Sequence, residues 1–252
     1  MTLVKVHAEN TKALCSEGSA DCTFVLLKDA NKQFVYINQK RAQHRMSPFS
    51  TFKIANSLIG LERGIISDAE QILTYDKNKY PSQAWWPSVW KLPTYNLTSA
   101  YKFSVVPIYR QLASDIGEKS MTEFLTQFSY GNQDISSGLD DFWLNGSLKI
   151  SAVEQVTFLQ KMYRGQLGLS THTLATMKMV MVANKTESYT IFAKTGAGKV
   201  DDGTMLGWYV GIVEKADGVY YFALNFNRDS YQAMKADRIE MAMNHLRVLG
   251  II

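Results

Sequence analysis

Strand-like segments occupy both ends of this chain, and helix-like segments fill the middle. β-Branched and aromatic residues fill Thr23–Leu27 and Gln33–Ile37 near the start. Asp29, Ala30 and Asn31 supply turn residues between them, so these two segments predict a hairpin. Three further strands are predicted near the end of the chain, at 188–194, 206–214 and 219–227. Because the two sets of strands lie so far apart in sequence, we expect both ends to contribute to one antiparallel sheet.

Helical periodicity begins at Ser50. Ile54, Leu58 and Leu61 recur at helical spacing after it, and Gly64 suits the end of this helix. Further helices are predicted at 105–128, 171–182 and 232–248, and another from the capping box Ser151-Ala152-Val153-Glu154 to Gly165, whereas 67–100 predicts a long, irregular, packed segment.

A chain of 252 residues fits one large domain or two closely joined subdomains. The pattern therefore predicts an α+β fold: a discontinuous antiparallel-sheet domain flanked by helices, plus an all-helical domain. The sheet subdomain is expected at about 1–50 and 184–252, and the helical subdomain at about 51–183. A cleft between the two is the natural place for a ligand.

Charge and hydropathy exclude several classes of protein. The net charge of +4 is mild and scattered, which argues against a nucleic-acid partner. No run of 18 apolar residues exists, so no membrane span is expected. The N-terminus has no apolar stretch that could form a signal-peptide core, which leaves a cytosolic protein or a secreted one whose signal was replaced by a starting Met. Cys15 and Cys22 are compatible with two free thiols or with a short-range disulfide.

Several chemistries lack their motifs. The four histidines show no metal-ligand spacing, so no metal site is expected. The chain has neither a G-x-S-x-G nucleophile elbow nor a G-x-x-x-x-G-K-[ST] phosphate loop. Thr195-Gly196-Ala197-Gly198 is too short for a dinucleotide-binding fingerprint. The remaining candidates are serine and lysine.

The pattern S-x-x-K occurs three times, beginning at Ser50, Ser88 and Ser99. Only Ser50 begins a strongly helical run, where the positive end of the helix would stabilise an oxyanion. Three residues are nearly one helical turn, so Lys53 Nζ can lie beside Ser50 Oγ. A lysine held neutral by its environment can act as a base. We therefore identify Ser50 as the candidate nucleophile and Lys53 as its base.

Two more fragments strengthen this hypothesis. Ser104-Val105-Val106 begins a predicted helix and offers a second hydroxyl. Lys194-Thr195-Gly196 ends a predicted strand, where the glycine permits close approach of a ligand backbone and the lysine supplies positive charge. Together with S-x-x-K, these fragments are far more specific than any one of them alone.

The ordered motifs resemble a known family. S-x-x-K followed by K-T-G is typical of penicillin-interacting serine enzymes, whose middle motif is S-D-N. Here Ser104-Val105-Val106 replaces S-D-N, and Tyr130-Gly131-Asn132 and Phe142-Trp143-Leu144 follow it. This set resembles the class D β-lactamases, the oxacillinase type, from about residue 20 to the C-terminus. The resemblance implies a fold like that of serine β-lactamases and penicillin-binding transpeptidases, and hydrolysis of β-lactams through an acyl-enzyme.

The resemblance also implies a role for each catalytic residue. Ser50 resembles the acylated nucleophile, and Lys53 resembles the lysine that reacts with CO2 to give an N-carboxylated general base. Ser104 resembles the proton-relay hydroxyl, and Trp143 resembles the indole that hydrogen-bonds the carbamate. Lys194 resembles the lysine that faces the substrate carboxylate.

The residues expected to bind substrate follow in the same way. Val106, Thr195 and Gly196 belong to the matched motifs, and Arg238 resembles the arginine that anchors the substrate carboxylate. The backbone N–H groups of Ser50 and Ala197 would form the oxyanion hole. Family members often carry a bulkier residue than Ala197, which bears on substrate range.

The resemblance further implies a small-molecule β-lactam as partner, no cofactor beyond the CO2 or bicarbonate that carboxylates Lys53, and a monomer or homodimer. It implies a periplasmic location and favours the Cys15–Cys22 disulfide. Two alternatives stay open: a β-lactam-sensing receptor domain that is acylated without turnover, and a penicillin-binding peptidase or transpeptidase.

Overall fold

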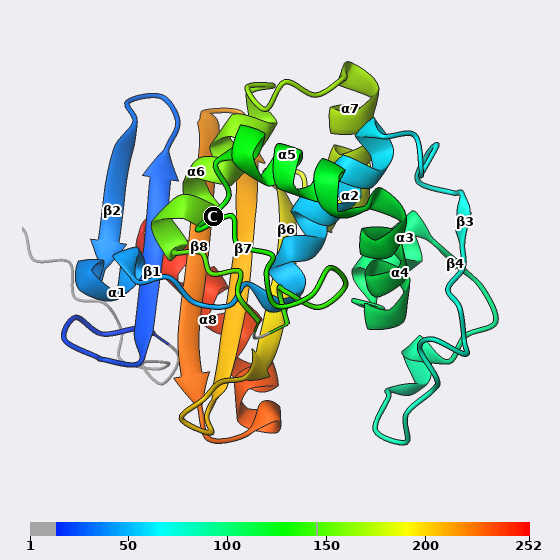
Figure 1. Cartoon of the computed structure of the whole chain (residues 1–252). Coiled ribbons are helices and arrows are strands. Elements are labelled where there is room, and N and C mark those ends of the chain that lie inside the picture. Colours follow the sequence, from blue (N-terminus) through cyan, green and yellow to red (C-terminus); the bar gives the residue numbers. More distant parts are fainter. Residues whose placement is uncertain (1–13, 145) are drawn as a thin grey trace, which may run out of the picture.

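The computed structural model of the chain describes residues 14–144 and 146–252 (Figure 1). Residues 1–13, which we assigned to the sheet subdomain, lie outside this part. The elements are, in order, β1 (Cys22–Lys28), β2 (Gln33–Ile37), α1 (Gln39–Gln43), the 3-10 turn η2 (Phe49–Phe52), α2 (Lys53–Glu62), β3 (Ile72–Leu73), the 3-10 turn η3 (Ser88–Trp90), β4 (Tyr95–Asn96), α3 (Leu97–Lys102), α4 (Val106–Ile116), α5 (Glu118–Phe128), α6 (Ala152–Tyr163), α7 (Thr171–Val180), β5 (Val182–Lys185), β6 (Tyr189–Lys199), β7 (Met205–Lys215), β8 (Gly218–Arg228) and α8 (Tyr231–Val248).

One six-stranded sheet joins the two ends of the chain. Its strand order is β2-β1-β8-β7-β6-β5, and every neighbouring pair is antiparallel. The pairing of β1 with β8 sets Val25 opposite Ala223. The predicted α+β fold with strands from both ends in one antiparallel sheet is therefore confirmed.

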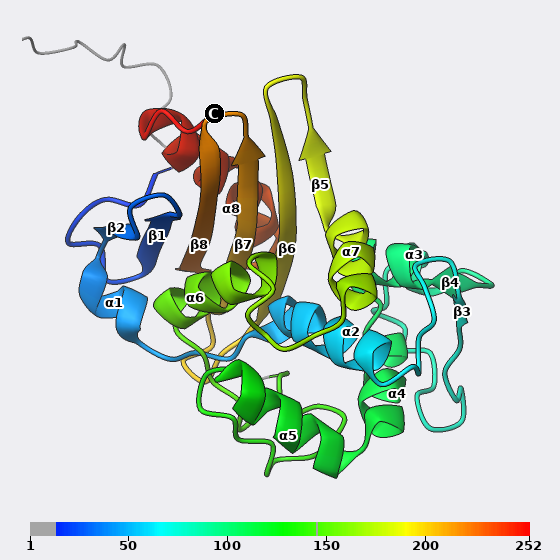
Figure 2. The same ribbon diagram turned by 90° about the horizontal axis from the view of Figure 1, so that it is seen from above.

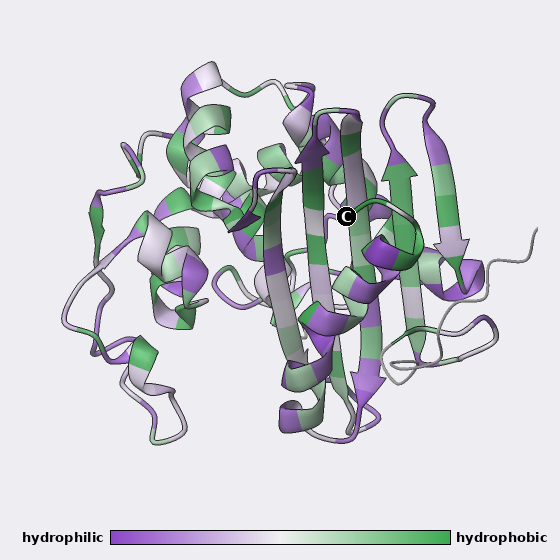
Figure 3. Ribbon diagram, turned by 180° about the vertical axis from the view of Figure 1, so that it is seen from behind, coloured by the Kyte–Doolittle hydropathy of each residue, from purple (hydrophilic) through white to green (hydrophobic). Residues whose placement is uncertain are grey.

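Helices cover both faces of this sheet (Figure 2). α8 packs behind β7 and β8, and α6 packs on the opposite face against β1, β7 and β8. Figure 3 views the α8 side and shows hydrophilic residues recurring along the helix. The inner side of α8 instead buries apolar residues such as Met234, Met241 and Leu246 against the sheet.

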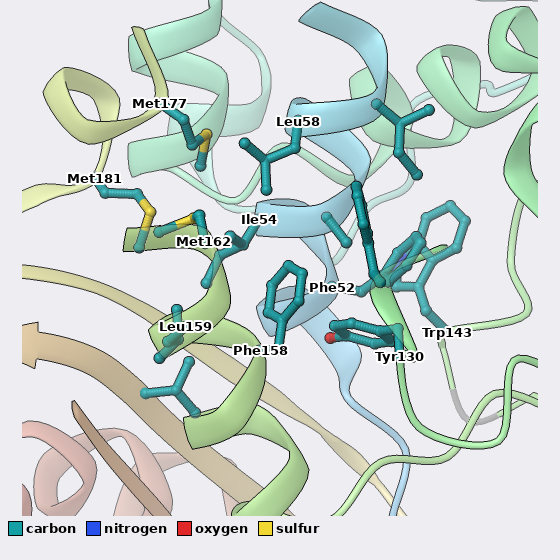
Figure 4. Close-up of a cluster of buried hydrophobic side chains, with 14 of the residues drawn as sticks. Phe52, Ile54, Leu58, Tyr130, Trp143, Phe158, Leu159, Met162, Met177 and Met181 are labelled. Carbon is teal, nitrogen blue, oxygen red and sulfur yellow. The ribbon is translucent and has the colours of Figure 1, made fainter. Parts of the chain in front are cut away.

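The helix α2 runs through the middle of the main core. Every residue from Lys53 to Leu61 is buried, so this helix has no solvent-facing side until its last residue. Figure 4 shows Ile54 and Leu58 of α2 beside Leu159 and Met162 of α6 and the methionines of the α7 region. A charged residue in such a helix has to be compensated or held neutral, and Lys53 is the first residue of α2.

Three local expectations need correction, and one element was missed. The helix predicted at 105–128 is two helices, α4 and α5, because Gly117 between them has a φ of 78°. The helix predicted at 171–182 ends at Val180, and Val182 begins the edge strand β5. The strand predicted at 188–194 continues to Lys199 as β6. The short helix α1 was not predicted.

The N-terminal segment is attached to the C-terminal helix. Cys15 and Cys22 form a disulfide with a Cα–Cα distance of 5.5 Å. The backbone N–H of Cys15 donates to Nε2 of His245 in α8 (2.9 Å), and the imidazole stacks on Phe24 of β1. Burial lowers the pKa of His245 to about 4, so the ring stays a neutral acceptor at physiological pH.

No helix in the described residues is long and apolar enough to cross a membrane.

Candidate active site

Ser50 and Lys53 lie side by side. Ser50 belongs to the 3-10 turn η2, and Lys53 follows it as the first residue of α2. In a 3-10 turn, residues three apart lie almost directly above one another. A hydrogen bond of 2.8 Å accordingly joins Lys53 Nζ and Ser50 Oγ. The contact predicted from the S-x-x-K spacing is therefore present, although a 3-10 turn rather than an α-helix creates it.

Lys53 lies in a place that disfavours its charge. Its side chain is fully buried, and Nζ lies 5.0 Å from the centre of the Tyr109 ring. Burial lowers the pKa of Lys53 from 10.5 to about 7. A large fraction of the side chain is thus neutral near pH 7, as a base toward Ser50 requires.

Trp143 brings an unused donor to the same core. The indole is fully buried and packs on Phe52, the residue before Lys53, with ring centroids 5.3 Å apart. Its Nε1–H has no hydrogen-bond partner among the described residues. A buried donor without an acceptor is costly, so this N–H is suited to an anion. Figure 4 shows Trp143 beside Tyr130 and Phe52.

Ser104 and Lys194 form a second hydroxyl–amine pair. Ser104 lies between α3 and α4, two residues before Val106, and its φ of 54° is in the left-handed region that residues with a Cβ rarely adopt. Such strain clusters at functional sites. Lys194 Nζ donates to Ser104 Oγ and to the Thr195 carbonyl (3.1 Å). The SxV and KTG fragments therefore meet in space.

Lys194 lies close to two other basic side chains, Lys53 and Arg238. Burial lowers its pKa well below the usual value, and the charges of Lys53 and then Arg238 lower it further. Because the charges of these basic groups disfavour one another, an anion beside Lys194 and Arg238 would stabilise their charged forms. The arrangement is therefore suited to a carboxylate ligand.

The position of the K-T-G motif differs from our prediction. Lys194 does not end a strand, because β6 continues for five residues beyond it. A Cβ at Gly196 would lie 2.8 Å from the Pro48 carbonyl oxygen, which also accepts from the Thr51 backbone N–H (3.1 Å) and Thr51 Oγ1 (2.8 Å). The chain's own backbone beside Ser50 therefore already requires glycine at this position.

Side chains along β6 alternate between the two faces of the sheet. Lys194 and Gly196 face η2, so Thr195 and Ala197 point to the other face. Ala197 pairs with Gly207, at which a Cβ would meet Met234 of α8. The Ala197 side chain therefore faces α8, so the group that it can offer the site is its backbone N–H.

Arg238 reaches the site from α8. It is half-buried, its Nε has no partner among the described residues, and burial lowers its pKa. Its charge acts on both Lys194 and Tyr209. An unpaired, partly buried guanidinium is suited to a carboxylate, as the resemblance implied.

Arg238→Ala is expected to raise KM for penicillins about tenfold with a smaller loss in kcat, because a charge-assisted hydrogen bond contributes about 1.5–3 kcal/mol and acts in the ground and transition states alike. Arg247→Ala, on the exposed side of the same helix, is the control. Steady-state kinetics with benzylpenicillin measures both. An unchanged KM in Arg238→Ala would show that the carboxylate is bound elsewhere.

The other two S-x-x-K sequences lack this geometry. Ser88 and Lys91 are both exposed, around the short turn η3. Ser99 completes a capping box with Asn96 at the start of α3, and Lys102 is exposed. In the described residues, no hydrogen bond joins the hydroxyl of either serine to the amine of its lysine, as one does between Ser50 and Lys53.

The sequence reasoning missed two aromatic residues of the site. Tyr109 of α4 lies under Lys53, and the Tyr101 ring of α3 lies 5.3 Å from Lys194 Nζ. Tyr109 is three residues after Val106, on the same side of its helix, so periodicity marked it as inward-facing. Which core residue it would contact depends on how α4 packs on α2, and the local sequence does not specify that.

The comparisons with known proteins agree with this geometry. Residues 2–243 match the family described as the penicillin binding protein transpeptidase domain. The chain is 40% identical over 205 residues to beta-lactamase OXA-48 of Klebsiella pneumoniae, which covers 81% of this chain and 74% of the relative. The solved structure of FUS-1 (OXA-85), a class D beta-lactamase from Fusobacterium nucleatum subsp. polymorphum, superposes with a TM-score of 0.84 and 34% identity, covering 92% of this chain and 93% of that one.

A regulator also resembles the chain, at lower identity. Regulatory protein BlaR1 of Bacillus licheniformis is 30% identical over 98% of this chain, but the match spans only 40% of the regulator. The β-lactamase relatives are more similar and match over most of their own length. By motif order, site geometry and similarity, this chain belongs to the class D β-lactamases.

Proposed function

We propose that this protein hydrolyses β-lactams through acylation of Ser50. The observation that carries the proposal is the 2.8 Å contact between Ser50 Oγ and a fully buried lysine whose pKa is lowered to about 7. A hydroxyl is a weak nucleophile until a base takes its proton, and Lys53 is placed to do so. The β-lactamase names of the similar proteins support the choice of substrate.

Acylation uses both hydroxyl–amine pairs. Ser50 Oγ attacks the lactam carbonyl while its proton passes to the base at Lys53. The backbone N–H groups of Ser50 and Ala197 stabilise the oxyanion. The lactam C–N bond breaks, and the pair of Ser104 and Lys194 delivers a proton to the leaving nitrogen. Arg238 holds the substrate carboxylate, and Thr195, whose side chain points to the α8 face of β6, lies on the same side of this strand as Arg238.

The surroundings of Lys53 fit an N-carboxylated side chain. Only a neutral amine reacts with CO2, losing a proton as the N–C bond forms, and burial keeps much of Lys53 neutral. The unpartnered, buried N–H of Trp143 offers the new anion a hydrogen bond. When present, the carbamate supplies a base that can activate both Ser50 and the water that releases the acyl group.

Activity is expected to depend on bicarbonate in the acid range. As pH falls through about 7, Lys53 becomes protonated and can no longer react with CO2, so turnover in degassed buffer should decline with time and return when bicarbonate is added. Trp143→Phe keeps the aromatic packing but removes the N–H, so it should require more bicarbonate. ¹³C NMR with labelled bicarbonate should show a carbamate signal that Lys53→Met lacks. If neither the wild type nor Trp143→Phe responds to bicarbonate between pH 5 and 8, Lys53 acts as a plain amine.

Nitrocefin hydrolysis tests the function itself. Sustained turnover is expected, with a steady-state rate that far exceeds one equivalent per enzyme molecule. A single stoichiometric burst, followed by a stable adduct in the mass spectrum, would instead indicate a receptor domain like the regulator described above. Cleavage of D-Ala-D-Ala peptides without nitrocefin turnover would indicate a peptidase.

We further infer that the protein acts outside the cytoplasm, in the periplasm or a similar oxidising compartment. The Cys15–Cys22 disulfide supports this location, because such bonds persist under oxidising conditions and are rare in the cytosol. That the enzyme acts as a monomer or a homodimer stays a prediction.

A further inference from the structure

The residue before the nucleophile has an unfavourable backbone conformation. Phe49 has a φ of 48°, in the left-handed region. Glycine adopts this region freely, but a residue with a Cβ does so only when its surroundings enforce it. The neighbouring structure must therefore hold Phe49 in place.

Two contacts hold Phe49 from opposite sides. Its backbone N–H donates to the carbonyl of Trp143 (3.0 Å). Its ring is buried against β6 at Gly198, where an added Cβ would overlap the ring, since the three nearest atoms all belong to Phe49. Only glycine at 198 leaves room for this ring. Phe49 is thus fixed between the Trp143 segment and β6.

The conformation of Phe49 determines where the next N–H points. The peptide group between Phe49 and Ser50 carries the Ser50 N–H, and the backbone angles of Phe49 orient that group. This N–H is one of the two oxyanion donors in the proposed mechanism.

The other oxyanion donor is next to Gly198. The Ala193 N–H donates to Met181, away from β7. N–H directions alternate along a strand, and β6 pairs with β7 without a register shift, so the Ala197 N–H also points away from β7. The edge of β6 beyond Ala193 is not paired with β5, and η2 packs against β6.

We propose that Phe49 is a positioning residue for the oxyanion hole. Phe49 precedes the donor Ser50, and Gly198 follows the donor Ala197. The packing of the Phe49 ring on Gly198 therefore joins the two segments that carry the donors. It thereby fixes the distance and orientation between the N–H groups of Ser50 and Ala197. The proposal rests on the proposed function, because the oxyanion hole that Phe49 would position acts during acylation of Ser50.

Acylation rates of four variants test this role. Phe49→Ala keeps the Cβ but loses the ring that enforces the left-handed conformation, so the acylation rate constant should fall about 10- to 100-fold, as expected for a misplaced oxyanion donor. Phe49→Gly also loses the ring but adopts the conformation without cost, so it should acylate about tenfold faster than Phe49→Ala. Gly198→Ala should slow acylation by displacing the ring, and the double variant Phe49→Gly/Gly198→Ala should return to the rate of Phe49→Gly.

Stopped-flow measurements with a penicillin separate the acylation rate constant from the dissociation constant of the initial complex, which should stay unchanged. Phe24→Leu removes a buried ring elsewhere and is the control: it should lower thermal stability without slowing acylation. Equal rates for Phe49→Ala and Phe49→Gly, or a wild-type rate for Phe49→Ala, would overturn the positioning role. If the wild type itself is not acylated, the proposed function fails instead.

Discussion

Ser50→Ala is expected to lose turnover of penicillins by about 10⁴-fold or more, because the removed oxygen is the one that forms the acyl bond. Thermal stability should change little, since Ser50 is only partly buried and the substitution removes one hydrogen bond, to Lys53. Steady-state hydrolysis and intact-protein mass spectrometry after mixing with a penicillin measure the loss.

Ser88→Ala is the matched control, because it removes a serine of an exposed S-x-x-K sequence and should leave activity unchanged. A covalent penicillin adduct on Ser50→Ala would show that another serine is the nucleophile, with Ser88 and Ser99 the next candidates.

Lys53→Met is expected to be inactive and more stable than the wild type at pH 7 in bicarbonate-free buffer. The folded protein holds the amine with a pKa of about 7, against 10.5 for an exposed lysine. Between these values the unfolded chain binds a proton that the folded chain does not, which favours unfolding. Methionine has a similar shape and no such cost, so its gain should be roughly 1–4 kcal/mol.

The pH dependence distinguishes this effect from better packing. The free energy of unfolding of the wild type should rise from pH 7 toward pH 10 as the unfolded lysine also loses its proton. The advantage of Lys53→Met should therefore shrink over that range. Urea unfolding at pH 7 and pH 9.5 measures it, and a constant advantage would mean that the lysine titrates normally. Bicarbonate should also reduce the difference in unfolding free energy between Lys53→Met and the wild type at pH 7, because the carbamate gains a hydrogen bond from Trp143.

The sequence predicted those features whose geometry is set by residues close together in the chain. The capping box at Ser151 and Glu154 is formed as expected, with each side chain bonded to the other's backbone. The S-x-x-K spacing predicted the contact between Ser50 and Lys53, because three residues span one turn in either kind of helix.

Other features depend on distant partners. The strand was expected to end at Lys194, yet pairing with β7 extends β6 through Gly196 and Gly198 to Lys199. The left-handed conformations of Phe49 and Ser104 carry no local signal, because neither residue type prefers that region. For Phe49 the cause lies on β6, far along the chain, and only the folded structure reveals it.

The pairing of β1 with β8 has a consequence for the order of folding. Val25 and Ala223 are opposite one another although almost the whole chain separates them, and contacts of such high sequence separation form slowly. The helices of the middle can form early from local contacts, whereas the β1–β2 hairpin cannot join the other strands of the main sheet until residues 218–228 are available. Ser50 and Lys53 can thus approach each other early, but the segment with Lys194 and Gly198 joins them only with the strands near the C-terminus. We therefore expect the catalytic centre to form among the last events of folding, and a chain that ends before β8 to lack both Arg238 and the strand that pairs with β1.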